Sequence, residues 1–366
     1  MKEFISAGLT SIKRLIGKTF DGPGSLSGLL LVINIKNKMH ISIINICLTM
    51  FMISGCDITE NSLTHINGVM HANVNGSDFE RSRNFYKKLG FIATFEVEDT
   101  VSAEFAEGLD MPPYSIQATP IILSDGSLID LIKWKDPFDN SSPYSNLNHP
   151  GISSISLTTR NIDCDVEKLK EWGIEFISDP INGEGTDADI RFVFFKDPDG
   201  TWIQLIEKVG SKLPKLFGMN ITGILQINVN TRNLESSLSF YKMLGFKVVK
   251  EYENSGTSEY AAAYGMTSFQ IRGALLSLSK GPSINLIEWR DPVDNEAPYE
   301  HLHHLGIARI ALETKDLDAD FETLEKLGVK FFAEPKKPEG NLSFLRFSCF
   351  KDPDGTVIEL VQYDIL

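Results

Sequence analysis

The chain has 366 residues, of which 42% are hydrophobic and 23% are charged. This composition is typical of a globular protein, it excludes intrinsic disorder, and the length suffices for two domains with real cores. The formal net charge is −14. A chain of this charge without a basic stripe is not expected to bind nucleic acid or an anionic membrane surface.

The first 56 residues are predicted to be a leader. Residues 41–53 form a mostly apolar run that is too short to span a bilayer but is typical of the central region of a signal peptide. Lys36 and Lys38 precede this run, and Ser54-Gly55-Cys56 follows it. Residues 1–56 are therefore set apart from the folded domains.

Ser54-Gly55-Cys56 resembles the bacterial lipoprotein box. The resemblance implies cleavage before Cys56, a lipid anchor on its sulfur, a tether over residues 57–65 and a location in the bacterial cell envelope. The membrane would be contacted through this anchor only. The alternatives are a buried N-terminal helix and, if the leader is not processed, a cytoplasmic protein. Both Met1 and Met39 are candidate translation starts.

The cysteine spacing fits neither a zinc site nor a disulfide framework. Cys164 and Cys349 are isolated and are predicted to be ordinary thiols. The four cysteines are Cys47, Cys56, Cys164 and Cys349.

Most landmarks of the remaining chain occur twice, 155 residues apart. The sequence Lys-Asp-Pro-Asp-Gly stands at 196–200 and again at 351–355. A constant offset indicates a duplicated domain. We expect a first domain over 66–208, a linker over 209–220 and a second domain over 221–366. Other matched landmarks are Phe85-Tyr86 with Phe240-Tyr241, Leu89-Gly90-Phe91 with Leu244-Gly245-Phe246, Trp134 with Trp289, and His149 with His304.

Each half divides again into two modules, each with a strand, a helix and about three further strands. Lys-Asp-Pro-Asp-Gly predicts a tight turn before the last strand, because Pro presets φ at its first corner and Gly accepts a positive φ at its end. Each predicted helix begins at a capping Asp or Asn and ends at a Gly. The helices are predicted at 78–90, 163–173, 233–245 and 316–328.

The predicted strands carry apolar residues on one face and polar residues at matching places on the other. The apolar face is expected to lie under the helices. Polar groups buried without partners would cost about 1–3 kcal/mol each, so we expect the polar face to line a solvated or liganded cavity. Its residues are His71, Asn73, Asp130, Ser154, Gln204, Gln226, Asn228, Asn285, Arg309 and Glu359. Trp134, Trp202 and Trp289 share this parity and form either an aromatic cavity wall or packed strand ends.

These motifs together resemble the vicinal oxygen chelate superfamily, which includes glyoxalase I, bleomycin-resistance proteins and extradiol dioxygenases. The helix end Phe-Tyr-x-x-Leu-Gly-Phe, the sequence His-Pro-Gly-Ile at 149–152 and the repeated Lys-Asp-Pro-Asp-Gly carry the resemblance. It implies an α+β fold of tandem glyoxalase-like domains. Four βαβββ modules would form two cupped eight-stranded mixed sheets with helices on the convex face.

In this family a divalent metal sits in a cup, on side chains from the first and fourth strands of two modules. Short connections favour pairing of contiguous modules, so the first half would supply His71, Asp130, Ser154 and Gln204. We expect one divalent metal ion at most, held by His71, Asp130 and Gln204 with a water in fourth place. A hydrogen-bonded His71–Asp130 pair would explain the same residues without a metal.

The second half would supply Gln226, Asn285, Arg309 and Glu359. No metal is expected there, because a guanidinium cannot coordinate a cation, and an Arg309–Glu359 ion pair is expected instead. If the first and fourth modules pair, one cup holds His71, Asp130, Arg309 and Glu359, a set able to bind a metal and a substrate anion together. The cluster at 301–304, with three histidines, looks like a metal site but is expected to be structural.

Two functions follow from the resemblance, and a small molecule is the expected partner in both. The first is a non-catalytic protein that binds a small molecule in a cupped cavity, with Arg309 paired to a ligand carboxylate or phosphonate. The second is a metal-dependent lyase of the glyoxalase type, an isomerase or a ring-cleaving dioxygenase, whose metal polarises vicinal oxygens. The incomplete ligand sets favour the first function.

Overall fold

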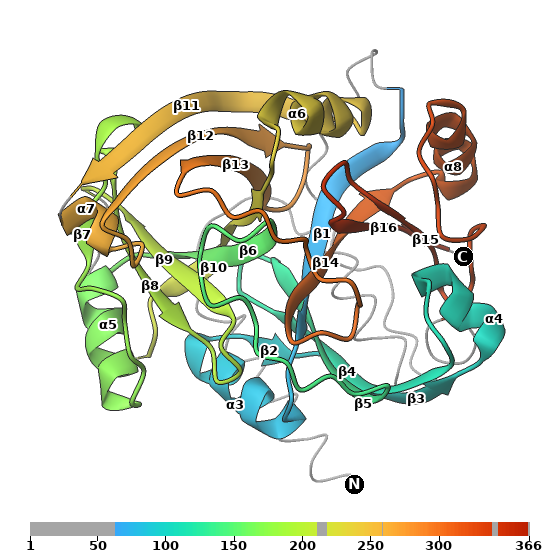
Figure 1. Cartoon of the computed structure of the whole chain (residues 1–366). Helices are drawn as coiled ribbons and strands as arrows, with labels where there is room; N and C mark the ends of the chain where they lie inside the picture. Colours follow the sequence, from blue (N-terminus) through green and yellow to red (C-terminus); the bar gives the residue numbers. More distant parts are fainter. Residues whose placement is uncertain (1–62, 211–217, 258, 339–342, 365–366) are drawn as a thin grey trace, which may run out of the picture. The chain divides into compact units, whose positions relative to one another are not determined.

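The computed structural model describes residues 63–366 apart from 211–217, 258, 339–342 and 365–366 (Figure 1). The leader, the Cys56 anchor and residues 57–62 of the tether lie outside the described residues and remain predictions. In the described part of the chain, no helix is long and apolar enough to cross a membrane.

Four modules follow one another along the chain. The first contains β1 (Ile66–Asn75), α3 (Phe79–Leu89), β2 (Ile92–Ala93), β3 (Val97–Val101), α4 (Ala103–Ala106), the 3₁₀ helix η1 (Glu107–Leu109), β4 (Tyr114–Ile122) and β5 (Leu128–Asp136). The second contains β6 (Gly151–Thr159), α5 (Ile162–Glu171), β7 (Ile181–Asn182), the 3₁₀ helix η2 (Gly185–Asp187), β8 (Ile190–Lys196) and β9 (Trp202–Lys208). The third contains β10 (Ile221–Asn230), α6 (Leu234–Met243), β11 (Lys247–Thr257), α7 (Glu259–Ala262), β12 (Ser268–Ser277) and β13 (Ser283–Asp291). The fourth contains β14 (Gly306–Thr314), α8 (Leu317–Lys326), β15 (Leu345–Lys351) and β16 (Val357–Tyr363).

The predicted helices are confirmed, with shifts of one or two residues at their ends. Asp78 caps α3 by accepting a hydrogen bond from the backbone N–H of Arg81, and Gly90 ends the helix at φ 107°. In α5 the cap is Asn161 and not Asp163, because the Asn161 side chain reaches the N–H of Cys164. Local sequence signals therefore suffice for these four helices, whereas the short helices α4 and α7 were not predicted.

The strands form two eight-stranded mixed sheets, as the resemblance implied. Sheet A has the order β15-β16-β14-β1-β5-β4-β2, with β3 beside β4, and sheet B has the order β11-β12-β13-β10-β6-β9-β8-β7. The first and fourth modules thus share sheet A, and the second and third share sheet B. Figure 1 shows the blue β1 beside the red β14, whose strands pair antiparallel.

The expected pairing of contiguous modules is therefore wrong. The 14 residues between β5 and β6 can reach about 45 Å when extended, so the chain can cross from one sheet to the other. The preference for short connections therefore does not determine the pairing here, because a connector of this length lets the next module join either sheet. Each half of the duplicated sequence contributes one module to each sheet.

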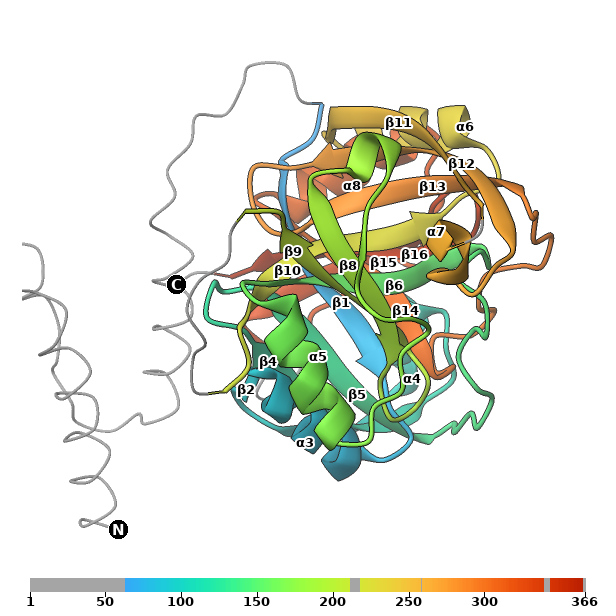
Figure 2. The same cartoon turned by 90° about the vertical axis from the view of Figure 1, so that its left-hand side faces the viewer.

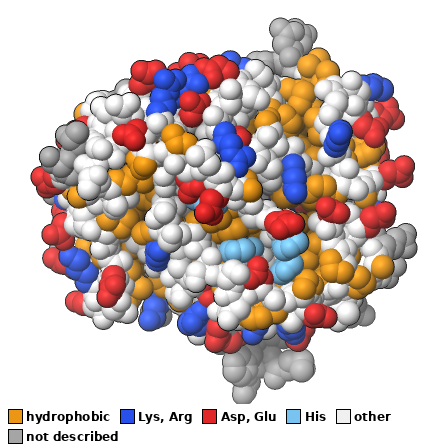
Figure 3. Space-filling model, in the orientation of Figure 1, with side chains coloured by type: hydrophobic (Ala, Val, Ile, Leu, Met, Phe, Trp, Pro, Cys, Tyr) orange, Lys and Arg blue, Asp and Glu red, His pale blue; other side chains and the backbone are white. Residues whose placement is uncertain are grey.

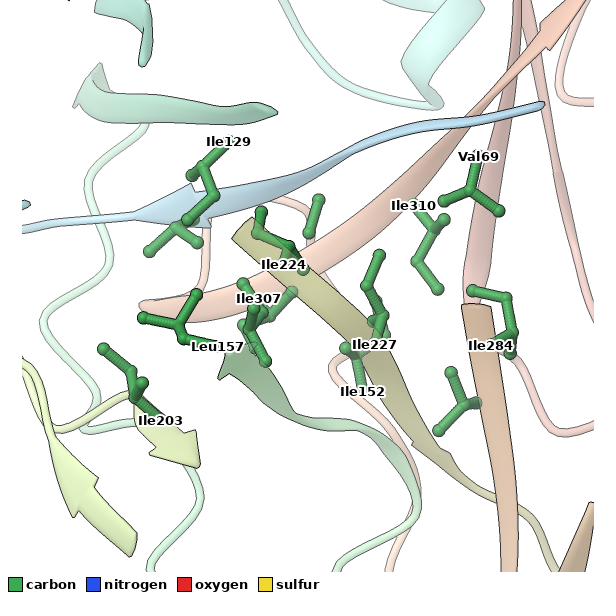
Figure 4. Packing of buried hydrophobic residues seen from close by; sticks show 14 of the residues in the cluster. Val69, Ile129, Ile152, Leu157, Ile203, Ile224, Ile227, Ile284, Ile307 and Ile310 are labelled. Carbon is green, nitrogen blue, oxygen red and sulfur yellow. The ribbon is translucent and has the colours of Figure 1, made fainter. Parts of the chain in front are cut away.

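One hydrophobic core lies behind both sheets. Figure 4 shows Val69, Ile129 and Ile310 of sheet A near Ile227 and Ile284 of sheet B, all buried in one cluster. Apolar residues of α3, α5, α6 and α8 belong to the same cluster. Figure 2 shows α3 and α5 next to each other, and Lys88 of α3 lies 5.3 Å from the Trp172 ring at the end of α5. The opposite face of each sheet is thus left for a cup.

The repeated turn joins the two sheets. In the first copy, the Gly200 N–H donates to the Asp197 carbonyl at 3.0 Å, and Gly200 has φ 100°. The buried Asp197 carboxylate also accepts a hydrogen bond from Tyr86 of α3, at 3.0 Å. In the second copy Tyr241 donates to Asp352 at 3.2 Å. A turn of one sheet is in each case locked to a helix of a module from the other sheet.

Candidate functional site

The polar residues predicted from strand parity divide between two cups. Cup A is the polar face of sheet A and carries His71, Asn73, Asp130, Trp134, Arg309 and Glu359. Cup B is the same face of sheet B and carries Ser154, Trp202, Gln204, Gln226, Asn228, Asn285 and Trp289. The expectation that His71, Asp130 and Gln204 share one cavity is wrong, because Gln204 lies in the other sheet.

The four polar positions of cup A are ionisable, and His71, Arg309 and Glu359 are buried whereas Asp130 is half-buried. Arg309 of β14 donates from Nε to Glu359 of β16 at 2.9 Å, which confirms the predicted ion pair. The Asp130 carboxylate accepts a hydrogen bond from the Asn73 side chain at 3.1 Å. The alternative His71–Asp130 hydrogen bond does not form, and the buried Nδ1 atom of His71 has no hydrogen-bond partner among the described residues.

Burial shapes the protonation of cup A. Burial, together with the nearby Arg309 charge, lowers the pKa of His71 to about 3, so its imidazole is neutral. Burial also raises the pKa of Asp130 to about 6, although the positive charge of Arg309 opposes this shift. Above about pH 6 the Asp130 carboxyl is therefore ionised, and the neutral His71 adds no charge to the cup.

The rest of cup A is packed with apolar side chains. The short helix α4 and the following η1 contribute Ala106 and Leu109 to one buried cluster with side chains of the sheet, and η1 contacts β15. Met70 is only 7% exposed in this cluster. The helices α4 and η1 thus enter the cup and do not lie behind the sheet. The buried members of the cluster are Met70, Ala106, Leu109, Tyr114, Ala118, Ile132, Trp134, Leu302, Ala308, Ala311, Phe347, Cys349, Val357 and Val361.

The residues of cup A do not fit a divalent metal. Arg309 brings a fixed positive charge to one of the four ligand positions and already holds Glu359 at another. His71 and Asp130 remain, which are two donors where a protein site normally offers three or four. Among the described residues, no group of three or more His, Cys, Asp or Glu side chains is placed to hold a metal ion.

Cup B has uncharged residues at the same four positions, and they form a hydrogen-bond network. Asn228 of β10 is its centre. Its amide oxygen accepts from Gln226 at 2.9 Å and from Asn285 at 3.0 Å. Its amide nitrogen donates to the hydroxyls of Ser154 and Ser156, both at 2.9 Å.

The network continues outward to β9 and β11. Ser156 donates to the Gln204 amide oxygen at 2.6 Å, and Tyr252 donates to the Asn285 amide oxygen at 2.8 Å. The Gln204 amide nitrogen and the Gln226 amide oxygen have no hydrogen-bond partner among the described residues. Neutral amides and hydroxyls that already bond one another are poor ligands for a divalent cation, so cup B does not fit a metal either.

A cavity of about 180 Å³ opens above this network. Gln204, Gln226 and Asn285 line its polar side, and Leu225, which is 41% exposed, lies on its wall. Its full lining is Leu147, Ser153, Ser154, Asp187, Asp189, Ile190, Phe194, Gln204, Ile206, Leu225, Gln226, Asn228, Lys250, Tyr252, Tyr264, Ile271, Leu275, Asn285, Ile287 and Trp289.

The three predicted tryptophans have different roles. Trp134 and Trp289 donate from Nε1 to Asn75 and Asn230, both at 3.0 Å, and only Trp289 lines the cavity of cup B. Trp202 lies beneath the Lys196 ammonium group, 4.1 Å from its ring centre, outside the cavity lining. Trp134 and Trp202 are thus packed strand residues.

Sequence reasoning missed the outer lining of cup B. Lys250 and Tyr252 come from β11, and Asp187 and Asp189 come from η2 and the residues after it. The alternation of Lys250 and Tyr252 is a period-two signal that could have placed both on one face. The aspartates lie in an irregular segment, where no periodicity exists to be read.

The histidine cluster near the end of the third module lies on the surface. His301 and His303 stack with ring centres 5.2 Å apart and line a hollow of about 50 Å³ with Asp110 and Met111. Figure 3 shows histidine side chains gathered together on the face of the molecule drawn there. Since no metal-holding group occurs among the described residues, the cluster is not assigned as a metal site.

Comparison with known proteins identifies the class of this fold. The family model described as the Glyoxalase/Bleomycin resistance protein/Dioxygenase superfamily matches residues 68–205 and again 223–360. The chain belongs to this superfamily. The two matches fall on the two halves of the duplicated sequence.

Individual relatives carry related names. Glyoxalase I of Saccharomyces cerevisiae is 28% identical over 229 residues, which cover 60% of this chain and 66% of the yeast protein. The match thus spans just under two thirds of that protein's length. A lactoylglutathione lyase of Schizosaccharomyces pombe is 24% identical over 58% of this chain and 67% of its own.

The solved structure of glyoxalase I from Zea mays superposes with a TM-score of 0.56 at 17% identity. The superposition covers 81% of this chain and 92% of the maize chain. At this level of identity the likeness supports the fold alone.

Proposed function

We propose that this protein binds a small molecule in cup B without the help of a metal. The observation that carries the proposal is the cavity of about 180 Å³ above a network of amides and hydroxyls. A cavity of roughly 150 Å³ holds benzene, so cup B suits a compact ligand of about six to ten non-hydrogen atoms.

The chemistry of the wall supports this assignment. The Gln204 amide nitrogen can donate to a ligand acceptor, and the Gln226 amide oxygen can accept from a ligand donor. The other amides hold these two in place, and apolar side chains such as Leu225 and Ile271 supply the remaining contacts. This combination of few fixed polar groups and apolar walls is that of a small-molecule site.

The alternative is a metal-dependent lyase, isomerase or dioxygenase acting through the cup that holds His71 and Asp130. The names of the yeast relatives favour it, and so does the convergence of His71, Asp130 and Glu359 on one sheet. The Arg309 guanidinium within that set argues against it. We therefore do not propose metal-dependent catalysis for this protein.

A ligand screen of the full chain tests the proposal. Small polar compounds of the stated size, both neutral and cationic, are screened by shift in melting temperature, with saturable hits expected. Leu225→Trp should abolish the hits, because the larger side chain projects from an exposed position into the cavity. Val249→Trp is the matched control, since Val249 is 59% exposed on β11 and does not line the cavity.

The alternative predicts a different set of results. It requires about one divalent metal ion per chain and lactoylglutathione lyase or related activity, both lost in His71→Ala. Metal content measured on the purified chain, with Zn²⁺, Ni²⁺ and Mg²⁺ titrations, distinguishes the metal-dependent alternative from metal-free binding. Stoichiometric metal and activity, with no binding sensitive to Leu225→Trp, would overturn the proposal.

A further inference from the structure

The mouth of cup B carries an excess of negative charge. Asp187, Asp189 and Lys250 are the charged residues that line the cavity, a net charge of −1. Lys250 lies 3.6 Å from Asp187, so this ion pair largely neutralises itself. Asp189, which is exposed, supplies the remaining charge. The formal charge of the whole chain, −14, adds to a field that attracts cations.

Aromatic rings form the wall beside these carboxylates. Phe194, Tyr252, Tyr264 and Trp289 all line the cavity. The Tyr264 ring stands 5.3 Å from Phe194 and 6.2 Å from Trp289, inclined by 53° and 74°. The rings are therefore not stacked on one another, and each of them borders the cavity. The negative faces of aromatic rings attract organic cations, and quaternary ammonium groups are commonly bound this way.

A third observation points to a ligand independently of the charges. Gln204 is only 7% exposed, lines the cavity, and leaves its amide nitrogen without a partner among the described residues. Because this nitrogen borders the cavity and has no partner in the described chain, it is available to donate to a bound group. A hydroxyl or carbonyl oxygen of a ligand would satisfy it.

We infer that cup B selects an organic ammonium ion. Examples of this class are trimethylammonium compounds that carry a hydroxyl group or a small ring. The inference rests on the proposed function and names its ligand class. The methyl groups would lie against the aromatic and aliphatic wall, Asp189 would face the positive charge at the mouth, and Gln204 would donate to an oxygen of the ligand. Ions such as choline match the size of the cavity.

The test compares cations with a neutral isostere. Choline, tetramethylammonium and phenyltrimethylammonium are titrated calorimetrically against the full chain, beside 3,3-dimethylbutan-1-ol, which has carbon where choline has nitrogen. At least one cation should bind, and choline should bind about tenfold more tightly than the isostere. Asp189→Asn should reduce this preference several-fold, whereas Val249→Trp, which lies outside the cavity lining, should leave the binding of both compounds unchanged. Tyr264→Leu should weaken the binding of every cation, and Leu225→Trp should abolish the binding of all the compounds.

The outcomes separate this inference from the proposed function. If no cation binds, or if the neutral isostere binds as tightly as choline, the ammonium inference is overturned. Neutral hits that remain sensitive to Leu225→Trp would then leave the proposed function standing. If nothing binds in a way that Leu225→Trp affects, both fail. Because Asp189 is exposed, its substitution tests charge without threatening the fold.

Discussion

Cup A and cup B are built from matched strands of a duplicated sequence, yet the polar residues are ionisable in cup A and uncharged in cup B. His71, Asp130, Arg309 and Glu359 of cup A correspond, at an offset of 155, to Gln226, Asn285, Ser154 and Gln204 of cup B. The exchanges of Asp130 for Asn285 and Glu359 for Gln204 remove a charge and keep the shape. Cup A buries its charges under apolar side chains, and cup B keeps a cavity.

The difference follows from what each set of groups can satisfy. In cup A the charges need partners, which the Arg309–Glu359 ion pair and the hydrogen bond from Asn73 to Asp130 supply. In cup B each amide has both donors and an acceptor, so the network satisfies itself and still leaves groups free at its edge. A shared fold therefore does not imply a shared site.

Breaking the ion pair of cup A should have the largest effect. Arg309→Ser leaves Glu359 charged and nearly buried without its partner, so we expect a loss of about 3–5 kcal/mol in the free energy of unfolding. The double variant Arg309→Ser/Glu359→Gln has the two residues that cup B carries at these positions and should recover most of this loss. Urea unfolding measures both. A double variant no more stable than the single one would contradict this view.

The contrast in packing predicts unequal costs at a matched pair of positions. Met70 is 7% exposed and Leu225, at the equivalent position, is 41% exposed. Met70→Ala should therefore cost about 2–5 kcal/mol, whereas Leu225→Ala should cost about 0.5 kcal/mol. Chemical unfolding of the two variants, side by side, gives the difference. Equal costs would show that cup A is no more densely packed than cup B.

The turn that locks the sheets makes stability depend on pH. Burial, helped by the neighbouring Asp199 charge, raises the pKa of Asp197 to about 6, despite the hydrogen bonds that its carboxylate accepts. This exceeds the ordinary value of 3.8, so the folded state holds its proton more tightly than the unfolded state. The stabilisation is complete below about pH 4 and is lost as the pH rises through about 6.

Asp197→Asn removes this titration. The stability deficit of the variant relative to the parent should therefore shrink by about 2–3 kcal/mol between pH 4 and pH 7.5. Asp352→Asn should behave alike, because burial raises the pKa of Asp352 to about 6 as well. Tyr86→Phe is the control, since it removes a hydrogen bond but keeps the carboxylate. A deficit that does not change with pH would count against the raised pKa.

Most of the fold could be predicted from local sequence signals. The helix from Phe79 to Leu89 follows from its Asp78 cap, its apolar spacing and Gly90, and strand parity placed the polar residues on one face. The pairing of modules could not be predicted in this way. It depends on contacts between distant segments, such as Tyr86 with Asp197, and no local pattern encodes them.

The polar residues of the candidate site could be predicted from the sequence, but which of them share one cup could not. The ion pair between Arg309 and Glu359 was expected because both residues lie in the same module. The prediction that His71 and Gln204 share one metal site was wrong, because the two residues belong to modules that do not pair. The packing of cup A and the cavity of cup B were beyond prediction, since they depend on how side chains from four strands fill a curved surface.

The smallest expected effects come from exchanging the isosteric residues Asp130 and Asn285 between the two cups. These exchanges test whether each cup is more stable with its own residue than with that of the other cup. Burial raises the pKa of Asp130 to about 6, so its ionised form is disfavoured in the folded state. Asp130→Asn should therefore increase stability by about 1–2 kcal/mol at pH 7.5 and give no gain at pH 4. Asn285→Asp should instead cost about 1–3 kcal/mol at pH 7.5, because it removes the donor to Asn228 and sets two acceptors against each other. Thermal unfolding at the two pH values measures both variants. If both exchanges were neutral, the charges of cup A and the amides of cup B would be interchangeable, and the contrast between the cups would have no energetic basis.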